Sequence, residues 1–168
     1  LRDLIDFACS CGIEAACLPA YASEFYKLTD DERLRVVSVA VKHAAGRIKI
    51  IAQSNHPSLK SAKRLAQENI KSGADIISIA VPRIFGLPEN ALMEYMSEFV
   101  QSVGDTPVLI QDFNPGGASI SAAFIKRLHD THPNFRYVKL EEPLCAPKFE
   151  EIIKVTEGKV GLFEGWGG

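Results

Sequence analysis

The stretch DIISIAV, residues 75–81, is the part of the sequence that most clearly indicates the fold. Apolar side chains run through it almost without interruption, whereas a strand with one face in water alternates apolar and polar residues. Such a run is typical of a parallel strand that is covered on both faces. Three further runs have the same character: IKIIA (residues 48–52), PVLIQ (107–111) and KVGLF (159–163).

Segments with helical periodicity alternate with these strands. The clearest helix start is Thr29-Asp30-Asp31-Glu32, a capping box that precedes an apolar stripe. The predicted strands span residues 14–18, 48–52, 75–81, 108–111, 136–140 and 160–163. The predicted helices span about residues 1–11, 29–46, 58–72, 88–103, 121–131 and 147–158. This alternation predicts an α/β protein.

Two architectures fit this order, an open doubly wound sheet and a (β/α)8 TIM barrel. The open sheet loses its main support because no Gly-x-Gly-x-x-Gly follows any predicted strand. The strand–helix unit repeats about every thirty residues, close to one eighth of a barrel of about 250 residues. The chain starts at Leu1 and ends at Gly168 directly after a predicted strand. We therefore expect a single TIM-barrel domain over residues 1–168, with about six units present and both ends truncated.

Composition narrows the possible partners. Charged residues make up 24% of the chain, the net charge is −2, and no basic run is present, which argues against a nucleic-acid surface. The sequence shows no apolar run that would span a bilayer and no signal-peptide pattern, so we expect no membrane partner and a cytoplasmic location. The four cysteines do not have a metal-binding spacing, and we expect reduced thiols that pack as small hydrophobic side chains.

The predicted strand in FRYVKLEEPL, residues 135–144, contains a lysine. Alternation places Tyr137, Lys139 and Glu141 on one face and the apolar Val138 and Leu140 on the other. The apolar face suits packing against helices, so the polar face points into the barrel. Partial removal from water favours the neutral amine of Lys139, which can attack a carbonyl and form a Schiff base. An interior ion pair of Lys139 with Asp112 or Glu141 fits the same spacing.

Polar residues also gather where the other predicted strands end, and ligands bind at the carboxyl ends of parallel strands. These residues are Tyr21, Ala22, Ser23 and Glu24, then Gln53 to His56, Arg83, Gln111, Asp112, Asn114, Glu164, Gly165 and Trp166. Arg83 suits a substrate carboxylate or a surface ion pair. His56 fits a helix-entry position better than a site role. Asn114 to Gly117 is most simply a turn, and Trp166 suits a pocket wall or a frayed terminus.

Several of these motifs resemble those of one family. Leu28-Thr29-Asp30-Asp31-Glu32-Arg33 matches an L-T-x-x-E-R motif, and Gly73-Ala74-Asp75 matches a G-A-D before a strand. Tyr137-Val138-Lys139-Leu140-Glu141 matches the context of a Schiff-base lysine, and Glu164-Gly165 matches a glycine-rich strand end. The chain resembles the dihydrodipicolinate synthase / N-acetylneuraminate lyase family of class I aldolases and dehydratases over essentially its whole length.

The chain also departs from the family pattern. The resemblance implies a proton-relay tyrosine at residues 111–115, but Gln111-Asp112-Phe113-Asn114-Pro115 contains none. The second family tyrosine is missing from residues 82–85, and the hydroxyl-rich turn has become Tyr21-Ala22-Ser23. The pairs Ser23-Glu24 and Gln111-Asp112 instead resemble the subgroup that includes L-2-keto-3-deoxyarabonate dehydratase.

The resemblance implies a cofactor-free lyase, dehydratase or aldolase, that acts on a 2-keto acid such as pyruvate or a 2-keto-3-deoxy sugar acid. Lys139 would form the imine, and Glu141 would be an acid/base or a counter-ion. Substrate-binding roles are implied for Tyr21, Ala22, Ser23, Gln111, Asp112 and Gly165, with no metal and a homo-oligomer, dimer or tetramer. Two alternatives stay open: a non-catalytic member that binds or oligomerises, and an unrelated α/β domain whose lysine only pairs with an acid.

Overall fold

The structure is a computed structural model that describes residues 1–82, 86–113 and 120–165. Contacts divide the chain into two compact units, Leu1–Ser78 and Ile79–Gly168, and each is described by itself. The predictions for Arg83, for the turn at residues 114–117 and for Trp166 lie outside the described residues. The single domain over residues 1–168 stays a prediction.

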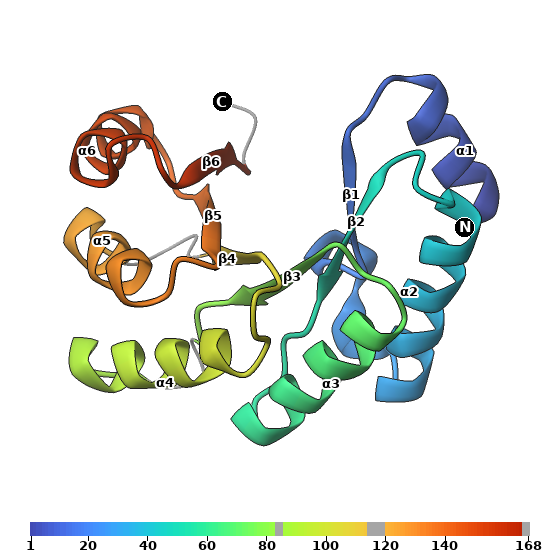
Figure 1. The fold of residues 1–168 in the computed structure, drawn as a ribbon, viewed down its shortest axis with the longest axis horizontal. Helices are drawn as coiled ribbons and strands as arrows, with labels where there is room; N and C mark the ends of the chain where they lie inside the picture. Colours follow the sequence, from blue (N-terminus) through green and yellow to red (C-terminus); the bar gives the residue numbers. More distant parts are fainter. Residues whose placement is uncertain (83–85, 114–119, 166–168) are drawn as a thin grey trace. The chain divides into compact units, whose positions relative to one another are not determined.

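The first unit contains a parallel sheet with the strand order β1-β2-β3 and helices on one side of it (Figure 1). Its elements are α1 (Arg2–Ser10), β1 (Ala15–Leu18), the 3-10 helices η1 (Tyr21–Ser23) and η2 (Phe25–Lys27), α2 (Asp30–Ala44), β2 (Lys49–Gln53), α3 (Leu59–Lys71) and β3 (Ile76–Ala80), whose last residues belong to the second unit. Helix α2 packs against both α1 and α3. The predicted alternation is therefore confirmed here.

The start of α2 follows the predicted capping box. The Thr29 hydroxyl accepts a hydrogen bond from the Glu32 N–H at 3.3 Å, and a Glu32 carboxylate oxygen accepts one from the Thr29 N–H at 2.9 Å. These bonds satisfy two backbone donors that the first helical turn leaves without partners. Ser58 caps α3 in the same way through the Ser61 N–H.

The second unit continues the strand–helix order from the end of β3. Its further elements are α4 (Glu89–Gln101), β4 (Val108–Phe113), α5 (Ala122–Thr131), β5 (Phe135–Glu141), α6 (Ala146–Thr156) and β6 (Gly161–Glu164). Strands β4, β5 and β6 are parallel neighbours, and α4, α5 and α6 lie in a row along one side of them (Figure 1). The N–H of Val81, just after β3, donates to the Gln111 carbonyl of β4 at 2.9 Å.

Over residues 137–141 of β5, burial follows the predicted alternation with one exception. Val138 and Leu140 are fully buried among apolar side chains of the second unit, and Tyr137 and Lys139 are partly exposed. Complete burial of an apolar side chain of this size contributes about 1.5–3 kcal/mol, which holds β5 beneath the helices. Glu141 shares the face of Lys139 but is itself buried. Its carboxylate therefore needs partners within the protein.

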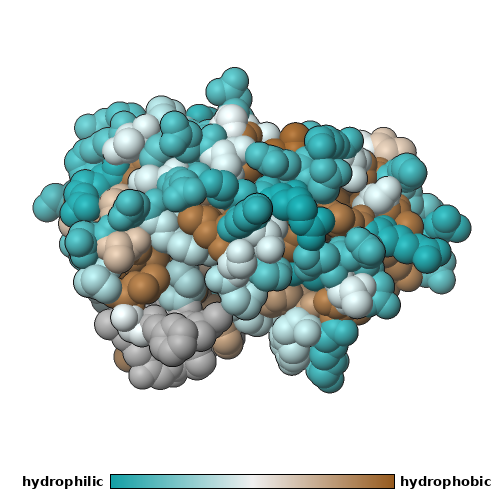
Figure 2. Space-filling view, turned by 90° about the horizontal axis from the view of Figure 1, so that it is seen from below, coloured by the Kyte–Doolittle hydropathy of each residue, from teal (hydrophilic) through white to brown (hydrophobic). Residues whose placement is uncertain are grey.

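None of the four cysteines forms a disulfide. Cys145 is buried as predicted, but the packing predicted for Cys11 and Cys17 is wrong, because both are exposed. Across the described residues, no helix is both long and apolar enough to cross a membrane. On the face drawn in Figure 2, hydrophilic residues cover most of the surface and hydrophobic ones are scattered between them.

Candidate active site

Three neighbouring strand ends in the second unit bring four predicted site residues together. In the sheet register, Gln111 of β4 lies beside Lys139 of β5, and Phe113 lies beside Glu141. On the other side of β5, Lys139 lies beside Phe163 and Leu140 beside Glu164, so Gly165 directly follows the paired part of β6. Because parallel strands end at the same edge, these side chains meet at the carboxyl edge of the sheet.

Lys139 forms an ion pair at this edge. Its Nζ lies 3.1 Å from Oε1 of Glu141, within direct proton-transfer reach. The Lys139 side chain is 35% exposed, whereas the Glu141 side chain is 9% exposed. The amine is thus open to a molecule arriving from solvent, while the acid is held behind it. The ion pair predicted as one alternative is present, and its partner is Glu141.

The same Glu141 oxygen has a second donor. Nε2 of Gln111 donates a hydrogen bond to Oε1 of Glu141, and both residues are buried. A buried carboxylate without donors is costly, so the hydrogen bond from the Gln111 amide offsets part of the cost of burying Glu141. The sequence predicted a substrate-binding role for Gln111 and contained no signal for this contact.

A side chain at the position of Gly165 would force neighbouring side chains to move. A Cβ atom there would overlap Cγ of Glu141, and it would lie 2.8 Å from both Cδ of Glu141 and Cε of Lys139. The Gly165 N–H donates to the Leu140 carbonyl at 3.0 Å, which fixes its backbone against β5. The absence of a side chain therefore leaves space for the pair of Lys139 and Glu141. The predicted contact of Gly165 with substrate stays a prediction.

Asp112 lies on the opposite face of β4 from Gln111, because side chains alternate along a strand. Its carboxylate is fully buried, accepts a hydrogen bond from the Ile120 N–H at 2.8 Å, and lies 3.9 Å from Nζ of Lys148. Lys148, one turn into α6, also pairs with Glu142 at 3.1 Å. Lys148 was not identified from the sequence. A cation that follows the acidic pair Glu141-Glu142 was the available signal. The substrate-binding role of Asp112 stays a prediction.

The turn for which the resemblance implied substrate binding lies in the first unit. Tyr21, Ala22 and Ser23 form η1, in which Ala22 and Ser23 are exposed and the Tyr21 ring packs edge-on against Phe25 at 5.1 Å between centroids. The Ser23 N–H donates to the Ala20 carbonyl at 3.0 Å, so a bound carboxylate would compete with that bond. The substrate-binding roles of Tyr21, Ala22 and Ser23 stay predictions.

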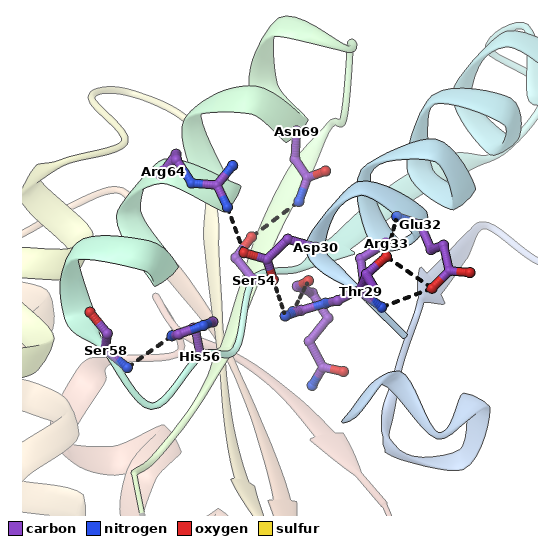
Figure 3. A network of polar contacts seen from close by, with 10 residues as sticks. Thr29, Asp30, Glu32, Arg33, Ser54, His56, Ser58, Arg64 and Asn69 are labelled. Carbon is purple, nitrogen blue, oxygen red and sulfur yellow. Dashed lines mark hydrogen bonds and ion pairs between the residues drawn. The ribbon is translucent and has the colours of Figure 1, made fainter. Parts of the chain in front are cut away.

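The first unit also contains a polar network that sequence reasoning missed (Figure 3). Arg33 of α2 is 5% exposed, donates from Nη2 to the Gln53 carbonyl at 3.2 Å, and stacks on the Phe25 ring at 5.0 Å. Burial lowers the pKa of the Arg33 guanidinium, and the charge of Asp30 opposes that shift. Its place in the L-T-x-x-E-R motif was the available signal.

Nearby in the same network, Nδ2 of Asn69 donates to Oγ of Ser54 at 3.2 Å, and both residues are buried (Figure 3). Nδ1 of His56 accepts a hydrogen bond from the Ser58 N–H at 2.9 Å, so His56 lies at the entry of α3, the position that the sequence favoured.

A comparison with protein families decides the membership of the chain. The model of the Dihydrodipicolinate synthetase family matches residues 1–166. The chain belongs to this family. The resemblance predicted from the sequence is thereby confirmed, and the unrelated α/β domain is excluded.

Two curated relatives of the chain are enzymes of the kinds that its sequence resembled, a dehydratase and a lyase. L-2-keto-3-deoxyarabonate dehydratase from Azospirillum brasilense is 27% identical over 154 residues, which cover 90% of this chain and 50% of that protein. N-acetylneuraminate lyase from Clostridium perfringens strain SM101 is 28% identical over 99 residues, which cover 59% of this chain and 34% of that protein. The chain spans about half the length or less of these relatives.

Solved structures of the dihydrodipicolinate synthetase family have the same fold. The crystal structure of dihydrodipicolinate synthase from Aquifex aeolicus matches with a TM-score of 0.90 and 27% identity, covering 98% of this chain and 56% of that one. Structures of this family are TIM barrels, and the chain covers about half of them. The predicted TIM-barrel class is therefore confirmed, and the open doubly wound sheet is excluded.

Proposed function

We propose that the protein is a cofactor-free Schiff-base lyase that acts on a 2-keto acid, with Lys139 as the nucleophile. The observation that carries the proposal is the pair of Lys139 Nζ and Glu141 Oε1 at 3.1 Å, at the carboxyl edge of the strands. That edge is where TIM-barrel enzymes have their active sites. Family membership supports the reaction class, because its curated members include a dehydratase and a lyase.

The first step is proton transfer within the ion pair. Glu141 takes a proton from Lys139, which leaves a neutral amine and a carboxylic acid. The amine attacks the keto carbon, and a carbinolamine forms. Glu141 then returns its proton to the carbinolamine hydroxyl, which leaves as water, and a protonated imine remains on Lys139.

The second step is elimination. The protonated imine withdraws electrons, so Glu141, again a carboxylate, removes a proton from C3 of the substrate and an enamine forms. In a 2-keto-3-deoxy sugar acid, the enamine expels the hydroxyl of the neighbouring carbon, which takes its proton from Glu141 and leaves as water. Hydrolysis of the imine returns Lys139 and releases the product.

The substrate class follows from the reacting groups and from the similarity to the Azospirillum brasilense dehydratase. A 2-keto-3-deoxy sugar acid supplies both the keto group for Lys139 and the leaving hydroxyl, and pyruvate supplies the keto group alone. We assign binding of the substrate to Tyr21, Ala22, Ser23 and Gly165, and we leave out Asp112 because its carboxylate is fully buried on the opposite face of β4 from Gln111. A cytoplasmic location and a homo-oligomer, dimer or tetramer, belong to the same proposal.

Trapping of the imine tests the proposal. The full-length protein is incubated with pyruvate or with a 2-keto-3-deoxy sugar acid, reduced with borohydride, and its intact mass and peptides are measured. We expect one adduct on Lys139 that is absent from Lys139→Ala. Lys159→Ala is the matched control, because Lys159 is an exposed lysine of the same unit that pairs with Glu157. Absence of an adduct with either class of keto acid would overturn the proposal.

The ion pair also favours a second candidate, a non-catalytic member in which Lys139 only balances the charge of Glu141. In that case no keto acid is trapped, and Lys139→Ala lowers the unfolding temperature because it leaves a buried carboxylate without its counter-ion. The loss of the counter-ion lowers the unfolding temperature under either function, so it is trapping of a keto acid that separates the two.

A further inference from the structure

We infer that Gln111 is a positioning residue that holds the carboxylate of Glu141 toward Lys139, and that it does not bind the substrate. The inference rests on the proposed function. It replaces the role that the sequence suggested for Gln111, because the structure places its amide nitrogen on Oε1 of Glu141.

One carboxylate oxygen connects the three side chains. Oε1 of Glu141 accepts the hydrogen bond from Nε2 of Gln111 and lies 3.1 Å from Nζ of Lys139. A carboxylate has a second oxygen with further lone pairs. Two contacts to Oε1, from Gln111 and from Lys139, restrict the orientation of the carboxylate through which a proton is exchanged with substrate.

Gln111 suits this task by its position and by its chemistry. Gln111 lies beside Lys139 in the register of β4 and β5, and only 5% of its surface is exposed. Its amide remains neutral at every pH at which the protein folds, so it donates whether Glu141 is ionised or has taken the proton of Lys139. A lysine or arginine in its place would compete with Lys139 for the carboxylate.

Gly165 restricts Glu141 from the other side. Because a Cβ atom at Gly165 would overlap Cγ of Glu141, the Glu141 side chain lies directly against the backbone after β6. Gln111 on β4 and the backbone at Gly165 thus enclose the acid from both neighbouring strands. A side chain held on both sides keeps one geometry through the proton transfers that the mechanism requires.

A double-mutant cycle tests the inference in the full-length protein. Gln111→Met keeps the length of the side chain and removes the donor, and we expect kcat to fall about tenfold to a hundredfold, part of the 10²–10⁴ that general acid–base catalysis contributes. KM changes by less than about threefold, since substrate contacts remain. In a Glu141→Gln background, the same substitution lowers kcat by less than about threefold, because the group that it positions is gone.

Two further variants keep the result interpretable. Gln111→Glu places a second carboxylate against Glu141 and is expected to lower kcat at least as much as Gln111→Met. Gln101→Met is the matched control, because Gln101 is an exposed glutamine at the end of α4 in the same unit. Circular dichroism and thermal unfolding of all variants show whether a loss of activity is a loss of folding.

The possible failures are distinguishable. If Gln111→Met raises KM and leaves kcat unchanged, Gln111 binds substrate and the inference is wrong. If kcat falls equally in both backgrounds, Gln111 acts independently of Glu141 and the inference is also wrong, although borohydride trapping on Lys139 persists and the proposed function stands. If the unmodified protein traps no keto acid, the proposed function fails and the inference is overturned with it.

Discussion

The two units differ in the polar side chains that meet near the ends of their strands. In the first unit, Arg33 donates to the Gln53 carbonyl and Asn69 donates to Ser54. These groups do not exchange protons near neutral pH. In the second unit, Lys139 and Glu141 form a pair that can exchange one, and the lysine is partly open to solvent. The comparison shows that burial of polar groups does not by itself indicate a reactive site. The proposed site differs in having a partly exposed lysine beside a buried carboxylate.

Lys139→Ala should have the largest effect of the substitutions described here. It tests whether the lysine of the second unit is catalytic or only structural. We expect turnover of a 2-keto acid to fall by about a thousandfold or more, because a covalent nucleophile is removed. Steady-state kinetics of the full-length protein measure it, with Lys159→Ala as the control. If turnover stays within about tenfold of that of the unmodified protein, Lys139 has a structural role, as Arg33 has.

Arg33→Ala tests the other side of the comparison. It removes a buried guanidinium that holds the Gln53 carbonyl and stacks on Phe25, and we expect the free energy of unfolding to fall by about 2–4 kcal/mol. Urea unfolding measures it. Arg35→Ala, at an exposed position of the same helix, should change stability by no more than about 0.5 kcal/mol. Equal effects of the two substitutions would contradict a structural role that is specific to Arg33.

Gly165→Ala tests the second unit alone, because the added methyl group would meet atoms of Glu141 and Lys139. The added methyl group would displace Glu141 and Lys139, and we expect turnover to fall about tenfold to a hundredfold. Kinetics together with circular dichroism measure the effect. Gly86→Ala is the control, because a Cβ atom there meets no atom within 4 Å. Normal turnover in Gly165→Ala would show that the pair tolerates displacement.

Thr29→Ala should have the smallest effect. Loss of the cap of α2 lowers the free energy of unfolding by about 1 kcal/mol at pH 7. Hydrogen bonds from the backbone and side chain of Thr29 lower the pKa of Glu32 below its ordinary 4.5. Because the folded pKa of Glu32 is lowered, its ionised carboxylate stabilises the folded state above pH 4.5. This stabilisation is lost as the pH falls through the folded pKa.

The difference between Thr29→Ala and the unmodified protein should therefore shrink as the pH falls below 4.5, in urea unfolding at a series of pH values. Thr131→Ala serves as the control, because Thr131 lies at the end of α5 and caps no helix start. An unchanged difference between pH 7 and pH 3 would mean that Glu32 takes no part in the cap.

Much of the fold was predictable because its signals are local. Apolar runs identified the parallel strands, and alternation along residues 135–141 placed Lys139 on the opposite face from Val138 and Leu140. The capping box located the start of α2. The candidate site was predictable in part: Lys139, Glu141, Gln111 and Gly165 were identified, and the structure brings them together.

The amino-acid sequence alone predicted the order of strands and helices, which side chains of β5 share a face, and the family of the chain. Each of these depends on residue types at short, regular spacings. Three contacts became known only from the folded chain: Gln111 donates to Glu141, 30 residues away, Asp112 lies near Lys148, and Gly165 leaves room for the pair of Lys139 and Glu141. The physical reason is that these contacts depend on the register between neighbouring strands. The periodicity of one segment fixes the face on which each side chain lies, but it does not say which residue of the neighbouring strand lies beside it.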